Sequence, residues 1–431
     1  MIEKIRNSYR VFLKGFISLF LLFQCVLGIL YWICNVTRSQ QFDTISTVGK
    51  LMAALPVLPV HLVQTGLVFA AAYYFFTRFW ERRRSLVCAL VAVTVPFVMQ
   101  VCLSETEHAV ALAAILCMAA GIVDGHTHQE SSGRFQSMLC GFSLAILIYC
   151  GAAYSCAAAL MGGIWLFIEC KKLLEKKRMW ILYLLVILTS VLIAGYGSYK
   201  QNQDNQDRMQ ITFESVLFKR FAYPGLNENL LDGAPDEIWA LYNGTEIEKF
   251  RHYPYLLDTT LESELIETWG EERTRELYLE MAWYGFLCGT KTDILMILED
   301  TLCYLTPQLM YPFYSNGTIL AEFGWSYQQF ISGQLYLAQL YLYGSLLGYA
   351  ASLLLTILYA LTSGITTHFR ALSATIRSSW PLLLCWLGFS LIFMMRGAAI
   401  FNYKYAAFQA ILGYLPILLI FRRTRTWDTS S

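Results

Sequence analysis

The stretch QVCLSETEHAVAL, residues 100–112, places Glu105, Glu107 and His108 within four positions of an otherwise apolar sequence. Carboxylate and imidazole side chains transfer protons, hydrogen-bond hydroxyl groups and bind divalent cations. One ionisable side chain at membrane depth costs at least about 2.5 kcal/mol on insertion scales. We therefore expect these three residues to face water or to serve a site.

Local structure accounts for only part of this stretch. Ser104 and Glu107 fit the S-x-x-E capping box, in which a hydroxyl and a carboxylate close the first turn of a helix. The box gives no structural role to Glu105 or His108. We therefore treat Glu105, Glu107 and His108 together as candidate site residues.

The composition is that of a membrane protein. Of the 431 residues, 56% are hydrophobic and 15% are charged, and apolar runs repeatedly reach the roughly 20 residues that cross a bilayer. A net charge of +1, with no concentrated basic face, argues against nucleic acid as a partner. The sequence also lacks a phosphate-binding loop, a dinucleotide fingerprint and an HExxH zinc helix.

The apolar runs predict an all-α polytopic membrane protein with about ten transmembrane helices. We expect an N-terminal transmembrane module over 1–197, a small, mainly helical extracytoplasmic subdomain over 198–331, and a C-terminal transmembrane module over 332–431. The expected spans are 11–34, 57–77, 86–103, 108–124, 136–151, 154–170, 179–197, 332–361, 380–395 and 405–421.

The positions of Lys and Arg predict the orientation. They concentrate in the N-terminal flank and in the segments 78–84, 171–178, 363–379 and 422–425, which all fall on one face. Cytoplasmic loops carry such an excess. We therefore predict a multi-pass protein of the plasma membrane with both termini cytoplasmic. The extracytoplasmic face then holds 198–331 and all the candidate site residues.

Three more candidates lie on that outer face. Asp43 follows the first span by nine residues and either caps a short helix on the bilayer surface, worth about 1 kcal/mol, or belongs to a site. Arg396 and Lys404 flank one tight connection and either snorkel to headgroups or bind a lipid phosphate. We favour the phosphate, because positive residues are sparse on this face.

This layout resembles the GT-C superfamily, the multispanning glycosyltransferases that take a sugar from a polyprenyl-phosphate carrier on the extracytoplasmic side. Tyr154 and Ser155 stand near the place where the middle spans of the family often have an arginine, and Thr44 follows Asp43 where many members have a second acid. The similar stretches are QFDT, VPFVMQVCLSETEHAVALAAIL, LCGFSLAILIYCGAAYSCAAALMGGIWL and RGAAIFNYKYAAFQAILGYLPIL.

The resemblance implies inverting transfer of the sugar to an acceptor hydroxyl. Asp43 would be the general base and Glu105 a second catalytic acid, because a carboxylate beside the reacting carbon can take the acceptor proton. No cofactor is required, although Asp43 and Glu105 offer the oxygen ligands of a divalent cation.

The same resemblance implies a set of substrate-binding residues and partners. Arg396 and Lys404, with Tyr403 beside them, would hold the departing lipid phosphate, whose charge they stabilise. Glu107 and His108 would bind the sugar or the acceptor. The partners would be a polyprenyl-phosphate-linked sugar, a glycan, lipid or protein acceptor, and membrane lipids.

Two other functions are consistent with the sequence. A polysaccharide polymerase or ligase would use arginines of the long outer region, such as Arg251, Arg273 and Arg275. A transporter or flippase would need Gly- or Pro-interrupted helices in two related halves, and the sequence shows neither clearly. Tryptophans of the outer region, such as Trp283, suit either a helix packed on lipid headgroups or a surface that stacks on sugars.

Overall fold

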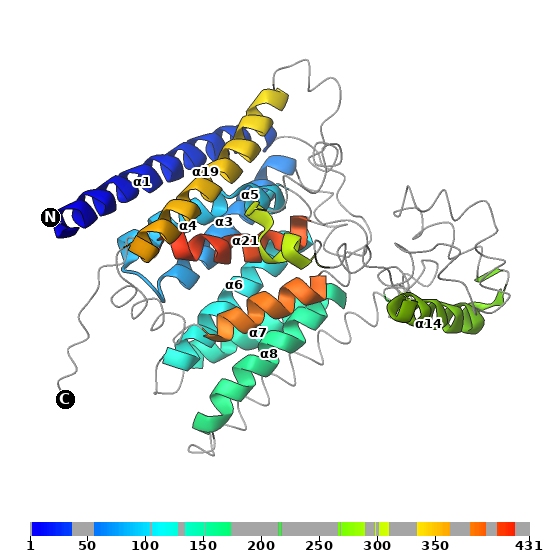
Figure 1. Ribbon diagram of the computed structural model, residues 1–431. Helices are drawn as coiled ribbons and strands as arrows, with labels where there is room; N and C mark the ends of the chain where they lie inside the picture. The colour runs from blue at the N-terminus through cyan, green and yellow to red at the C-terminus, as the bar shows by residue number, and fades with distance from the viewer. Residues whose placement is uncertain are drawn as a thin grey trace. The chain divides into compact units, whose positions relative to one another are not determined.

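All regular structure among the described residues of the computed structural model is helical (Figure 1). The chain divides into two compact units, the first formed by 1–199, 306–389 and 403–431 and the second by 200–305 and 390–402. The structure describes residues 2–36, 56–103, 106–127, 134–150, 152–173, 266–267, 269–288, 301–309, 334–362, 380–393 and 403–418, with single positions at 214, 217 and 298.

Four helices in the described part of the chain are long and apolar enough to cross a membrane: α1 (Ile2–Asn35), α3 (Val57–Phe76), α6 (Thr106–Thr127) and α19 (Gln334–Thr362). A bent pair of helices makes a fifth if it counts as one span. The chain is therefore helical, with the long apolar helices of a membrane protein. The expected count of ten spans is not confirmed within the described residues.

The remaining expected spans within the described residues are helical but shorter. Their apolar parts have 10–17 residues. At 1.5 Å per residue, even the upper limit reaches only about 25 Å, less than the roughly 30 Å of a bilayer core. The expected span 179–197 lies outside the described residues. The helices with these shorter apolar parts are α7 (Arg134–Tyr149), α8 (Ala152–Leu173), 380–393 and α21 (Tyr403–Leu418).

Helix α6 forms the centre of the first unit. It packs against α3, α7, α8 and α21. Of its span, 83% is buried inside the structure, against 33% for α3 and for α19. The outward sides of α1 and α3 carry exposed leucine, isoleucine, valine and phenylalanine side chains, as lipid-facing surfaces do.

Helices α1 and α19 lie side by side (Figure 1). Gly344 and Gly348, four residues apart on α19, face the rings of Phe23 and Phe20 of α1. A Cβ at Gly348 would overlap the Phe20 ring, and one at Gly344 would lie 3.1 Å from that of Phe23. Small residues at this spacing allow two membrane helices to approach closely.

The expected span 86–103 is not one straight helix, which corrects the prediction. It consists of α4 (Arg82–Val93) and α5 (Pro96–Cys102), bent by 79°. Pro96 has no N–H to continue the helical ladder, and its ring restricts the residue before it. Val95 accordingly has extended backbone, with φ −67° and ψ 131°.

Side chains from neighbouring helices bond the backbone around this break. Tyr341 of α19 donates its hydroxyl proton to the Thr94 carbonyl at 2.6 Å. Gln24 of α1 donates to the Val91 carbonyl at 3.4 Å. In a low-dielectric interior such bonds are required, because an unpaired buried carbonyl is costly. Gly28 of α1 permits the approach, since a Cβ there would lie 2.9 Å from Thr94 Cβ.

Candidate functional site

The structure describes the helices that carry four of the seven predicted site residues. Glu107 and His108 lie in the first turn of α6, and both are partly buried. Tyr403 and Lys404 are the first residues of α21, and their side chains fall outside the described part. The roles of all four remain predictions.

Asp43, Glu105 and Arg396 lie outside the described residues. The expected general base, the second acid and one expected phosphate ligand therefore have no described geometry. Asp43 and Glu105 were also the expected cation ligands. Among the described residues no three His, Cys, Asp or Glu side chains gather as a metal site would require.

His108 belongs to an aromatic cluster that joins the first turns of three helices. Its Nδ1 is hydrogen-bonded to the Tyr154 hydroxyl of α8 at 2.5 Å. Its ring meets the ring of Tyr405 of α21 edge-on, with centroids 5.5 Å apart and planes at 83°. The Tyr154 and Tyr405 rings are also 5.5 Å apart. We call His108, Tyr154 and Tyr405 the His–Tyr cluster.

Hydrogen bonds beside the cluster hold the helix ends in place. The Gln64 amide of α3 bonds the Thr106 hydroxyl, two residues before His108 on α6, at 2.7 Å. Ser155 of α8 donates to the Ile148 carbonyl of α7 at 3.2 Å. The start of α6 is thereby tied to α3, and the start of α8 to the last turn of α7.

The end of α1 and the start of α3 are joined at the same face. His61 Nδ1 lies 2.9 Å from the Val36 carbonyl, and Trp32 donates its indole N–H to Thr65 at 3.1 Å. By the predicted orientation this is the extracytoplasmic face. The helix ends that meet at this face are those of α1, α3, α6, α7, α8 and α21.

The cluster has a defined hydrogen-bonding capacity. A neutral imidazole has one donor and one acceptor nitrogen. The direction of the bond between Tyr154 and Nδ1 depends on the imidazole tautomer. If Nδ1 accepts, Nε2 of His108 donates, and if Nδ1 donates, Nε2 accepts. Tyr154 is only 4% exposed, so its phenol holds the imidazole in one orientation. Such an arrangement can bind a hydroxyl group, or an anion when the imidazole is protonated.

Glu107 lies beside the cluster. It stands in the first turn of α6, where the helix dipole favours a negative charge. Ser104, its expected partner in the capping box, lies outside the described residues. The capping role therefore stays a prediction, while the position of Glu107 in the first turn of α6 is an observation.

Two members of the cluster were not among the predicted site residues. Tyr154 was noted only for standing near the place of an arginine in the GT-C layout, and Tyr405 was not singled out. The only feature of the sequence that points to Tyr154 and Tyr405 is that each stands at the start of an apolar run. Tyr405 also follows Lys404 directly. That signal is weak, since tyrosine is common at both membrane interfaces.

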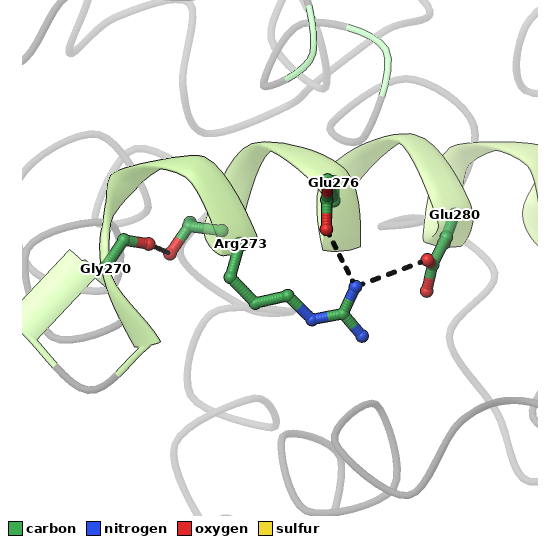
Figure 2. A network of polar contacts seen from close by, with 5 residues as sticks. Gly270, Arg273, Glu276 and Glu280 are labelled. Carbon is green, nitrogen blue, oxygen red and sulfur yellow. Dashed lines mark hydrogen bonds and ion pairs between the residues drawn. The ribbon is translucent and has the colours of Figure 1, made fainter.

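Two of the arginines that suit a polymerase or ligase are paired within their own helix, α14 (Glu271–Cys288). Arg273 contacts Glu276 at 3.0 Å and Glu280 at 3.5 Å (Figure 2). Arg275 contacts Glu271 at 2.5 Å. These pairs neutralise the charge that a substrate phosphate would need, so they weaken the case for that function. Arg251 lies outside the described residues.

The opposite ends of α3 and α6 carry an ion pair. The Arg78 guanidinium lies 2.8 Å from the Asp124 carboxylate, whose side chain is 10% exposed. The same guanidinium stacks over the Tyr74 ring, 4.4 Å from the ring centroid. Partly buried pairs are screened less by salt than exposed ones. We interpret this pair as a structural clamp.

No known protein family, curated protein or solved structure matches this chain.

Proposed function

We propose that this chain is a membrane glycosyltransferase that moves a sugar from a polyprenyl-phosphate carrier to an acceptor. The observation that carries the proposal is the His–Tyr cluster. Its three residues come from three of the stretches on which the GT-C resemblance rests, SETEH, GAAYSCAAAL and NYKYAAFQ. Their convergence at one set of helix ends is what a site built from those stretches requires.

The location suits this substrate class. A polyprenyl-phosphate sugar has an apolar chain that stays in lipid and a charged, hydroxyl-rich end that stays at the water interface. Helix ends that present an imidazole and phenol groups supply hydrogen bonds for sugar hydroxyls. Lys404 is the residue before Tyr405 in α21, and under this proposal it binds the lipid phosphate.

The proposed reaction uses Asp43 as the base. Asp43 takes the proton of the acceptor hydroxyl as its oxygen bonds to C1 of the sugar, and the C1–O bond to the lipid phosphate breaks with its electrons on the phosphate. Arg396 and Lys404 stabilise that leaving group. Glu105 assists as the second acid, and Glu107 and His108 bind substrate hydroxyls.

The proposal includes a cellular setting. The protein lies in the plasma membrane with both termini cytoplasmic, and the reaction takes place on the extracytoplasmic face. The acceptor is a glycan, a lipid or a protein. The chemistry needs no cofactor, and a divalent cation at Asp43 and Glu105 is an additional option that chelation would test.

Replacement of Asp43 by Asn tests the proposal. Asn caps a helix nearly as well as Asp, so a mere cap would tolerate the change. Loss of a base should lower transfer by roughly two to four orders of magnitude, at unchanged folded yield. The measurement is the surface glycan of the mutant strain, followed by transfer with the purified protein. Glu107→Gln keeps the capping geometry and separates the two roles of Glu107: transfer should be nearly unchanged if the carboxylate only closes the capping box, and should fall if it binds substrate. An unaltered glycan in the Asp43→Asn strain contradicts the assignment.

One observation favours a second function, a transporter or flippase. The bent pair α4 and α5 is a Pro-interrupted helix with side-chain hydrogen bonds around its break, as transporter helices often have. The two functions differ in where the lipid-linked sugar accumulates after removal of the protein. Loss of a transferase leaves it on the outer leaflet, and loss of a flippase leaves it on the inner one.

A further inference from the structure

The outward side of α14 changes in character along the helix. Its buried side includes Leu277, Tyr278 and Met281. The opposite side is charged in the first turns, with Glu272 and Glu276 exposed. In the last turns the same side is apolar: Leu279 is 43% exposed, Trp283 60%, Phe286 61% and Leu287 60%. We call these four residues the α14 apolar patch.

Most charged side chains of the first half pair within the helix. Arg273 bridges Glu276 and Glu280 along one side (Figure 2). Arg275 pairs with Glu271 one turn earlier. Exposed pairs of this kind add little stability, but their charges are costly to remove from water. This half of α14 therefore stays solvated.

The apolar patch has the spacing of one continuous helix face, i, i+4, i+7 and i+8. Trp283 and Phe286 lie against each other, with ring centroids 6.0 Å apart at 26°. A helix face that exposes Trp, Phe and two Leu is unfavourable in water and marks a contact surface. The helix is not among the candidate membrane spans in the described part of the chain.

We propose that the α14 apolar patch inserts into the interfacial layer of the bilayer that holds this chain's own membrane helices. The helix lies obliquely, with 279–287 in the layer and the charged first half in water. Tryptophan favours the headgroup level, and helices with an apolar face and a charged part bind there without crossing. The inference is independent of the transferase proposal.

The residue types favour lipid over other occupants. A second copy of α14 packed in parallel on this face would bring two sets of glutamates together, and an antiparallel copy would set the charged first turns of one helix against the apolar last turns of the other. A sugar would need hydrogen-bonding side chains beside the stacking ring. The exposed apolar neighbours of Trp283 on this face are Leu279, Phe286 and Leu287, and Glu280, three residues before Trp283, is already paired with Arg273.

Site-specific photocrosslinking in the full-length protein tests the inference. A benzophenone amino acid replaces Trp283 or Phe286 in one set, and Glu272 or Glu276 in the matched control set on the same helix. The protein is reconstituted in phosphatidylcholine nanodiscs and irradiated. We expect at least a fivefold excess of phosphatidylcholine adducts at the first two positions. A folding check by size-exclusion chromatography precedes each reaction.

Three outcomes would overturn the inference. Equal lipid adducts at all four positions would mean that the whole helix, or none of it, faces lipid. A dimer of crosslinked chains from Trp283 or Phe286 would show that a second copy covers the patch. Absence of lipid adducts at both positions, with the photolabel incorporated and the protein monodisperse, would place the patch in water.

Discussion

At the scale of single residues, the His108–Tyr154 bond is the contact on which the proposed site depends most. A buried phenol needs a partner for its hydroxyl, and here the partner is an imidazole 2.5 Å away. The Tyr405 ring packs against both partners. The orientation of the imidazole is thus set by a bond and by packing, from two other helices.

Tyr154→Phe removes the bond and keeps the ring. We expect the free energy of unfolding to fall by about 1 kcal/mol, the usual net worth of one hydrogen bond. Under the proposed function, transfer should fall on the order of tenfold, equivalent to about 1.4 kcal/mol in the barrier. Thermal unfolding and a transfer assay measure the two effects. Tyr405→Phe, which keeps the rings and the His108–Tyr154 bond, should lose less activity, and the reverse order would contradict the role given to Tyr154.

At the scale of helices, two kinds of contact hold the first unit together. Close approach between α1 and α19 depends on Gly344 and Gly348. The break at Pro96 depends on polar side chains. Among these, Gln24 has both ends of its amide engaged: its NH2 group bonds the Val91 carbonyl at 3.4 Å, and its oxygen accepts from Tyr414 of α21 at 2.5 Å.

Gly348→Leu tests the first kind of contact. The new side chain would collide with Phe20, so we expect a loss of about 1–3 kcal/mol in the free energy of unfolding, the usual cost of overpacking. The measurement is thermal unfolding of the purified protein in detergent. Gly66→Leu in α3 is the matched control, because nothing lies within 4 Å of a Cβ built there. Equal stability of the two variants would mean that α1 and α19 do not pack as described.

At the scale of the whole molecule, the distribution of charge predicts the orientation. The basic segments 78–84 and 171–178 follow α3 and the apolar part of α8, and the N-terminal flank precedes the apolar part of α1. Their ends therefore share one face, opposite to the ends that carry His61, His108 and Tyr154. The proposed chemistry needs that second face to be extracytoplasmic.

Epitope tags test this orientation. Tags at the N-terminus, at the C-terminus and within 198–331 should differ in accessibility to antibody in intact cells, with only the internal tag accessible, because cytoplasmic loops carry the excess of Lys and Arg. Permeabilised cells, in which all three tags should react, are the control. An accessible terminus together with an inaccessible internal tag would invert the orientation and remove the proposed site from the outer face.

The sequence by itself determined the helical class and the approximate position of each described membrane-type helix. These follow from the free energy of transferring an apolar run out of water, which depends on local composition and length. It also singled out His108 and Glu107, because ionisable groups between apolar runs need an explanation wherever they fold. Pro96 was not recognised in this way: the span 86–103 was predicted as one helix, although a proline lacks the N–H that continues a helical ladder.

Only the tertiary structure decided which of these residues meet. The partners of His108 come from α8 and α21, and the bonds around the Pro96 break come from α1 and α19. The 79° bend could not be predicted from the sequence either. A proline permits a break, but the helices packed around it select the angle. Such contacts join residues far apart in the chain, for example Tyr341 and Thr94. Their free energy depends on the packing of whole helices, and no local pattern of residues encodes it.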